Sequence, residues 1–258
     1  MTYSDGYARL VAQHYDAINE VLRGGSQDVA FYRALAQASG GPVLELGCGT
    51  GRVLLPIARD GVACVGVDAS RDMLDVFRAK LPPPNLELVR ATMESFDLGA
   101  RRFRLITVPF RAFSHLLDVP AQLAALANIR RHLAPGGRLA LDVFDPRLDR
   151  IALREEPEAL AARASTPRGA VQRFDRVTRD PARQLLTLRV RFVADAPEDC
   201  GEGELQLRWF HRYELEHLLA RAGFAIEQLY GGFDQRPWTP GGETIVIAKR
   251  SRKAGDVR

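Results

Sequence analysis

The sequence is poor in cysteine and has no long apolar run. Its three cysteines, Cys48, Cys64 and Cys200, are odd in number and contain no CxxC pair. This argues against a disulfide framework or a zinc knuckle and favours a reducing compartment. No stretch approaches the roughly 18 apolar residues of a membrane span, and the first residues lack the charged start and apolar core of a signal peptide. We therefore expect a cytoplasmic protein without a membrane partner.

The body of the chain also lacks an excess of either charge. The formal net charge is +4, and residues 249–258 alone hold five basic residues against one acidic residue. The tail thus accounts for the whole excess, and residues 251–258 are expected to be a disordered basic tail. Because the rest of the chain carries no net charge, it lacks the excess of basic residues that binds a phosphate backbone, and no nucleic-acid partner is expected. No cluster with metal-ligand spacing is visible, so we expect no metal.

Apolar spacing divides the chain into alternating helices and strands. Apolar residues recur at helical spacing around a Gly-Gly-Ser break at 24–26, which predicts two helices within residues 1–39. From 40 to 147, apolar runs alternate with helical segments, as in βαβ units of a parallel sheet with helices on both faces. The expected strands are 43–46, 62–67, 86–90, 103–108 and 137–144, and the expected helices are 52–59, 70–80 and 120–133.

The pattern changes between residues 148 and 210. Apolar and polar residues alternate from 186 to 192, which is typical of antiparallel strands with one covered face. Segments 170–177 and 204–210 look similar, so an antiparallel addition of about three strands is expected. Residues 211–250 return to the main sheet through a helix at 212–222 and strands at 224–230 and 243–249.

A glycine-rich loop follows the first strand. Residues 47–51 read Gly-Cys-Gly-Thr-Gly, and glycines before a helix let the backbone and its free N–H groups approach a ligand. Asp68 ends the second strand, where a carboxylate can accept both hydroxyls of a ribose. Its alternative role is to cap the next helix, although Ser70 is the more natural cap. Arg52 is too bulky for the NAD-binding fingerprint, which disfavours a dinucleotide site.

The segment LELGCGTGRVLLPIARDGVACVGVDAS, residues 44–70, resembles the signature of class I S-adenosylmethionine-dependent methyltransferases. In that family an acidic residue precedes a GxGxG loop and the second strand ends in Asp or Glu. The resemblance covers residues 40–145 and departs from the family at Thr92, where Asp is common, and at Phe103-Arg104. It implies S-adenosyl-L-methionine as cofactor. The implied cofactor-binding residues are Tyr15, Glu45, Gly47, Cys48, Gly49, Gly51, Asp68, Ala69, Met73, Thr92, Met93, Pro109 and Phe110.

The N-terminal segment YARLVAQHYDAI resembles the tyrosine-bearing lid helices of bacterial small-molecule methyltransferases, including aminosugar N-methyltransferases and relatives of glycine N-methyltransferase. The implied fold is α/β, with a doubly wound, Rossmann-like, seven-stranded, mostly parallel sheet, N-terminal lid helices and a small antiparallel β addition. The resemblance places lid helices at 1–39, the cofactor-binding core at 40–147 and an addition over the acceptor at 148–210. The core ends with 211–250, and the addition would also join two copies as a homodimer.

Acceptor chemistry is expected at the carboxyl end of the fourth strand. His115 follows that strand and is the candidate general base, because its unperturbed pKa lies near neutrality. Its alternative role is that of a solvent-facing or capping residue. Tyr15 is the second catalytic candidate, with buried helix packing as the alternative. The candidate acceptor-binding residues are Tyr7, Arg111, Phe113, His211, Phe233 and Trp238; Phe110 and Phe113 could equally belong to the core.

The predicted reaction is in-line methyl transfer from S-adenosylmethionine to a nitrogen or oxygen of a small molecule. Aminopropyl transfer is disfavoured because no acidic pair follows the fourth strand. The segment PFRAFS in that position also differs from the motif of nucleic-acid base methyltransferases. An alternative function is that of a non-catalytic sensor or assembly partner that binds the cofactor without turnover.

Overall fold

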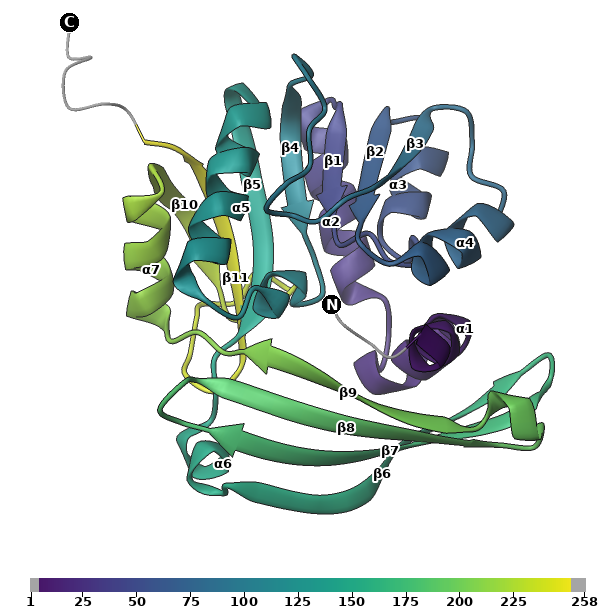
Figure 1. The fold of residues 1–258 in the computed structure, drawn as a ribbon. Helices are drawn as coiled ribbons and strands as arrows, with labels where there is room; N and C mark the ends of the chain where they lie inside the picture. The colour runs from purple at the N-terminus through teal and green to yellow at the C-terminus, as the bar shows by residue number, and fades with distance from the viewer. Residues whose placement is uncertain (1–4, 252–258) are drawn as a thin grey trace, which may run out of the picture.

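A seven-stranded sheet lies at the centre of the molecule (Figure 1). The computed structural model describes the backbone of residues 5–251 and the side chains of residues 8–251. The strand order is β10-β11-β5-β4-β1-β2-β3. The strands are β1 (Val43–Leu46), β2 (Cys64–Asp68), β3 (Leu86–Arg90), β4 (Phe103–Val108), β5 (Leu133–Phe144), β10 (Phe224–Tyr230) and β11 (Glu243–Arg250). Only the pairings of β11 with β5 and with β10 are antiparallel, which confirms the predicted doubly wound, mostly parallel sheet.

Helices cover both faces of this sheet because its strands alternate buried side chains. Leu44 and Leu46 of β1 join a core cluster under two helices, whereas Val43 joins the cluster on the opposite face. The first face carries α5 (Val119–His132) and α7 (Arg212–Arg221), and the second carries α2 (Gln27–Ser39), α3 (Leu54–Arg59) and α4 (Arg71–Ala79). The two-sided burial explains the near-continuous apolar strands in the sequence.

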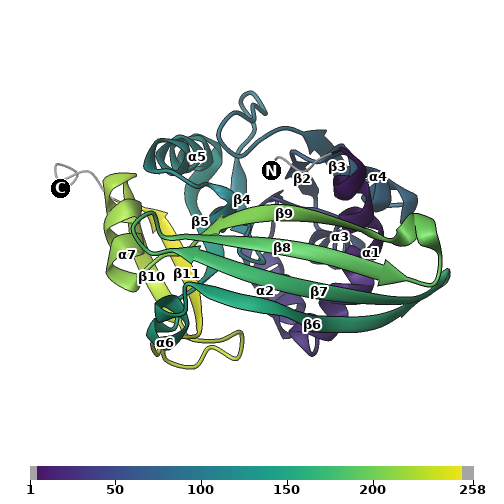
Figure 2. The same cartoon turned by 60° about the horizontal axis from the view of Figure 1, so that its bottom comes forward.

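A second, antiparallel sheet faces the carboxyl ends of the central strands, at the bottom of Figure 1 and in front in Figure 2. It has four strands in the order β6-β7-β8-β9, and α1 (Asp5–Arg23) packs on it through Ile18. Its elements are α6 (Leu148–Ala152), β6 (Glu155–Thr166), β7 (Gly169–Asp180), β8 (Leu185–Ala194), η2 (Pro197–Asp199) and β9 (Gly201–Arg208). The expectation of about three strands was wrong, because β6, EEPEALAARAST, is rich in glutamate and alanine, which are depleted in strands.

Most element bounds agree with the sequence-based ones to within two residues, and both ends of β1, β3, β4 and β10 agree fully. The largest shift is in β5, which begins at Leu133 rather than 137 because Phe103 of β4 already pairs with Leu133. The helix expected at 52–59 begins at Leu54. Apart from Ser251, the predicted basic tail lies outside the described residues. Within the described residues, no helix has the length and apolarity needed to cross a bilayer.

Candidate functional site

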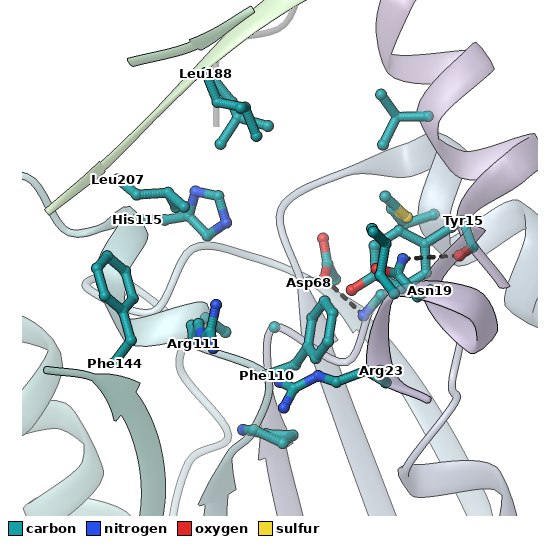
Figure 3. A pocket seen from close by; sticks show the side chains of 18 of the residues that line it. Tyr15, Asn19, Arg23, Asp68, Phe110, Arg111, His115, Phe144, Leu188 and Leu207 are labelled. Atoms are coloured by element: carbon teal, nitrogen blue, oxygen red, sulfur yellow. Dashed lines mark hydrogen bonds between the residues drawn. The ribbon is translucent and has the colours of Figure 1, made fainter. Parts of the chain in front are cut away.

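A cavity of about 750 Å³ lies where the central sheet, α1 and the antiparallel sheet meet (Figure 3). Its floor contains the loops after β1, β2, β3 and β4, and its roof is the inner face of β7, β8 and β9. Ligands of open α/β sheets bind at this carboxyl edge. The sequence-predicted site residues that line the cavity are Tyr15, Gly47, Gly49, Asp68, Ala69, Met73, Thr92, Met93, Pro109, Phe110, Arg111, His115 and Phe233.

The glycine-rich loop forms one wall of the cavity through its backbone. At Gly47, where φ is 69°, a Cβ would lie 2.7 Å from Cβ of Ala112 and 3.1 Å from Cε of Met93. A side chain is therefore excluded at this position, and the backbone stays accessible to a ligand. Gly51 does not line the cavity. A Cβ at this position would lie 2.3 Å from ring atoms of Phe77. Its requirement for glycine arises from packing against α4.

Asp68 combines loop bracing with a place in the cavity wall. One carboxylate oxygen accepts a hydrogen bond from Gly49 N at 2.8 Å, and the other accepts from Ser70 N at 2.8 Å. Burial raises the pKa of this carboxyl, and the two N–H donors oppose that rise. Ser70 caps α4 by accepting from Met73 N at 3.3 Å. Asp68 is thus not needed as the helix cap.

One face of α1 forms the opposite wall. Tyr15, Asn19 and Arg23 are spaced by four residues and all line the cavity (Figure 3). Arg23 places its guanidinium 4.1 Å from the ring centre of Phe110, and its buried Nη2 has no hydrogen-bond partner. Tyr15 was predicted from the sequence, whereas Asn19 and Arg23 were not, although helical spacing from Tyr15 could have identified them. This nitrogen also lies 3.8 Å from a carboxylate oxygen of Asp142, so the guanidinium is ion-paired within the protein.

The part of the cavity wall that follows β4 is a strained turn. Phe110 and Arg111 both adopt left-handed conformations, with φ of 56° and 59°, which non-glycine residues rarely occupy. Asp142 of β5 holds this turn because its carboxylate accepts from Phe110 N at 2.8 Å and Arg111 N at 3.0 Å. The hydroxyl of Tyr32 donates to the same carboxylate at 2.7 Å, and both Tyr32 and Asp142 are fully buried. We infer that these two residues position Phe110 and Arg111.

The substitution Asp142→Asn is expected to lower the free energy of unfolding by about 1–3 kcal/mol, because one buried N–H of the turn then faces an amide donor instead of an acceptor. Urea titration measures this change. The exposed Asp149, which only pairs with Arg147, supplies the control Asp149→Asn, with little expected effect. Equal stability of Asp142→Asn and wild type would contradict the proposed role.

His115 ends a short helix, η1 (Ala112–His115), and lines the cavity beside the roof. Figure 3 shows its ring near Leu207 and on the side of the cavity away from Tyr15. Burial lowers the pKa of His115 to about 4, because desolvation penalises the charged imidazole. The ring is therefore neutral at physiological pH and can accept a proton.

Several predicted acceptor residues lie outside the cavity lining. Phe113 is a correction, because its fully buried ring packs in the core against Phe210 at 5.6 Å. Trp238 is held elsewhere, since its Nε1 donates to Thr244 Oγ1 at 2.9 Å. His211 is the N-cap of α7. Tyr7 belongs to α1, but its side chain lies outside the described residues.

Glu45 and Cys48 lie beneath the loop and do not line the cavity. Glu45 is 1% exposed, and its Oε2 has no hydrogen-bond partner. Burial raises the pKa of Glu45 to about 8 and also raises the pKa of the Cys48 thiol. That these two residues contribute to cofactor binding, as expected from the sequence, stays a prediction.

Glu45→Gln is expected to gain stability over the wild type as pH rises. The folded-state pKa of about 8 exceeds the ordinary value, so the folded wild type holds a proton that the unfolded chain releases. Its stability therefore falls as pH rises toward 8 and then levels off. From pH 6 to pH 9 the variant should gain about 2–3 kcal/mol relative to wild type by urea titration.

The exposed Glu87, paired with Arg101, supplies the matched control for this titration. Glu87→Gln replaces an exposed carboxylate on β3, so the stability of this variant relative to wild type should not change between the two pH values. If Glu45→Gln behaves like Glu87→Gln, Glu45 is charged in the fold.

Three arginines of the antiparallel sheet are all paired with acids. Arg189 lies 3.8 Å from Glu204, and Arg191 and Arg208 pair with Glu158 and Glu214. None of the three lines the cavity. The sequence analysis missed Arg173 and Asp175, which do line it, because their neighbours along β7 do not alternate clearly between apolar and polar residues.

Comparison with known proteins agrees with this geometry. A family model described as a methyltransferase domain matches residues 43–137. The cypemycin N-terminal methyltransferase of Streptomyces sp is 26% identical over 245 residues, which cover 95% of this chain and 97% of that protein.

Solved structures are similar over most of the chain. The CcbJ methyltransferase from Streptomyces caelestis has a TM-score of 0.78 at 24% identity and covers 96% of this chain and 100% of its own. CalS10, an amino pentose methyltransferase from Micromonospora echinaspora solved with S-adenosylmethionine bound, has a TM-score of 0.68 at 25% identity and covers 89% of this chain and 94% of its own.

Proposed function

This chain is a class I S-adenosylmethionine-dependent methyltransferase with its methyltransferase domain at residues 43–137, and we propose that it methylates an amine nitrogen of a small acceptor. The observation that carries the proposal is a single cavity that joins Asp68 and the glycine loop to a neutral, half-buried histidine. Relatives whose names specify an amino pentose or an N-terminal position support nitrogen as the acceptor atom.

The cavity wall fits the cofactor. Asp68 would hold the ribose hydroxyls, and the bare backbone at Gly47 leaves room for the methionine part. Nη2 of Arg23 makes no hydrogen bond, although it lies 3.8 Å from Asp142, and it would donate to the carboxylate of that part. Met73 and Met93 line the cavity and would pack against adenine. When bound, S-adenosylmethionine supplies a methyl group whose carbon–sulfur bond breaks as the carbon–nitrogen bond forms.

The neutral histidine favours an amine over a hydroxyl. A hydroxyl releases its proton near the pKa of about 16 found for water, far from the pKa of about 4 of His115. An α-ammonium group has an ordinary pKa of about 8, and apolar surroundings lower it further. Proton transfer to His115 thus spans about four pKa units from an α-ammonium group, against about twelve from a hydroxyl, so His115 can assist loss of the ammonium proton, which leaves the nitrogen lone pair free to attack. The rings of Tyr15 and Phe110 meet edge to face at 6.0 Å on the other side of the cavity.

The test is methyl transfer to matched acceptors. Purified protein is incubated with S-adenosylmethionine and either an amine or the alcohol of the same carbon skeleton, and S-adenosylhomocysteine and the product mass are measured. We expect turnover with the amine alone. Turnover with the alcohol alone would contradict nitrogen transfer. Cofactor binding without turnover across amines, alcohols and thiols would instead favour the non-catalytic sensor.

A further inference from the structure

The roof of the cavity is apolar along three adjacent strands. Val177 of β7 pairs with Leu188 of β8, which in turn pairs with Leu205 of β9. Leu186 and Leu207 form the next pair on the same face. We call these five residues the leucine roof; all of them line the cavity and are half-buried. Figure 3 shows Leu188 and Leu207 pointing from the sheet toward the side that holds His115.

Apolar side chains that face a cavity select what binds there. A polar or charged body placed under the leucine roof would lose its water without gaining hydrogen bonds. An apolar body would instead be stabilised in proportion to the apolar area that it buries. Because the roof lies over the His115 side of the cavity, this selection acts on the acceptor, whereas Asp68 and the glycine loop form the opposite part.

One polar feature interrupts the inner face of the antiparallel sheet. Arg173 and Asp175 are two residues apart on β7 and therefore share a face. The guanidinium donates twice to the carboxylate, at 2.7 Å and 3.0 Å, and the side chains are only 15% and 20% exposed. Within the described residues, no hydrogen bond occupies Nη1 of Arg173. The pair is thus electrically neutral but still offers both a donor and an acceptor.

A neutral donor–acceptor pair is complementary to an amide group. An amide carbonyl can accept from Arg173 while its N–H donates to Asp175, and the ion pair stays intact. A phosphate or diphosphate bound at Arg173 would lie beside the carboxylate of Asp175, and the repulsion between these like charges is unfavourable. The pair therefore disfavours an acceptor attached to a nucleoside diphosphate.

We propose that the acceptor is the free amino end of an apolar, amide-bearing molecule such as a short apolar peptide. Its amine would lie at His115, its side chains under the leucine roof and an amide at Arg173 and Asp175. This inference rests on the proposed nitrogen transfer and narrows its substrate class. An α-amino group also suits His115 better than an alkyl amine, because its ordinary pKa is about 8 rather than about 10.

The experiment compares four probes by kcat/KM for S-adenosylhomocysteine formation: alanyl-leucyl-leucine amide, alanyl-seryl-serine amide, phenylethylamine and an aminosugar joined to thymidine diphosphate. We expect the leucine peptide to exceed the serine peptide by about tenfold or more, since a hydrophobic contact discriminates by that order. Phenylethylamine, which is apolar but has no amide, should be poorer than the leucine peptide. Preference for the serine peptide, phenylethylamine or the nucleotide sugar would overturn the proposal.

Variants assign the preference to named residues. Leu188→Asn should raise KM about tenfold for the leucine peptide and little for the serine peptide. Asp175→Asn should remove the advantage of the leucine peptide over phenylethylamine. Arg189→Gln is the control, because Arg189 lies on the same strand but is exposed on the other face. Unchanged Kd for S-adenosylmethionine shows that a variant is folded, and equal losses for both peptides would overturn the proposal.

Failure of the two proposals would look different. If no amine in the panel yields methylated product although S-adenosylmethionine binds, nitrogen transfer itself is wrong. If amines are methylated but polar or phosphate-bearing ones are preferred, nitrogen transfer stands and only the apolar, amide-bearing class is wrong.

Discussion

Replacing His115 by glutamine is expected to lower kcat about a hundredfold while the Kd of S-adenosylmethionine stays unchanged. A general base contributes about 10²–10⁴-fold, and the lower end is expected because an α-amine is already partly neutral in water. The residue lines the cavity and is neutral through burial, so its removal affects proton acceptance and leaves the cofactor wall intact. Single-turnover kinetics with the leucine peptide separates this chemical step from product release.

The pH profile gives this prediction a second readout. Because the pKa of His115 is about 4, its ring stays neutral above pH 5 or so and adds no limb to kcat/KM in that range. The rate should rise only with deprotonation of the acceptor amine, in wild type and variant alike. The exposed His217 on α7 provides the control His217→Gln. A wild-type limb near pH 6–7 that disappears in His115→Gln would show that His115 titrates near its ordinary pKa.

Replacing Asp68 by alanine is expected to weaken binding of S-adenosylmethionine and S-adenosylhomocysteine by tenfold or more, about 1.4 kcal/mol. The carboxylate is placed to accept ribose hydroxyls, and it also accepts from Gly49 N and Ser70 N. Its loss removes a ligand contact and loosens the loop that carries Gly49. Calorimetric titration measures both affinities directly.

Two further variants separate these contributions. Asp68→Asn retains the shape and one acceptor oxygen, so it should bind more tightly than Asp68→Ala and more weakly than wild type. Asp75→Ala removes an exposed acid of α4 that pairs only with Arg71 and Arg78, and it should leave both affinities unchanged. If Asp68→Ala binds as tightly as wild type, the ribose does not lie at the end of β2.

Local sequence patterns were enough to predict the residues on the cofactor side of the cavity. Gly47, Gly49 and Asp68 lie within one strand–loop–helix–strand unit, so their spacing along the chain largely determines their spacing in the fold. The helical period of α1 could likewise have extended the prediction from Tyr15 to Asn19 and Arg23. The confirmed class I fold and its cofactor follow from such short-range relations.

The acceptor side depended on contacts between distant parts of the chain. The hydrogen bond between Tyr32 and Asp142 joins residues 110 positions apart, and no pattern near Asp142 predicts the turn that it holds. Phe113 lies two residues before His115, yet only His115 lines the cavity, because η1 turns the two side chains apart. In this helix a separation of two residues decides whether a side chain lies in the core or in the cavity. Sequence periodicity cannot resolve that difference in so short a helix.

The sequence by itself thus determined the α/β class, the glycine loop with Asp68, and the cofactor, because these depend on local spacing and on alternation of buried side chains. Only the tertiary structure decided that an apolar roof with one neutral ion pair faces His115. That outcome depends on the register of β7, β8 and β9 and on the docking of their sheet over the cavity. A shift of one residue in such a register would exchange the leucines for outward-facing residues such as Arg189.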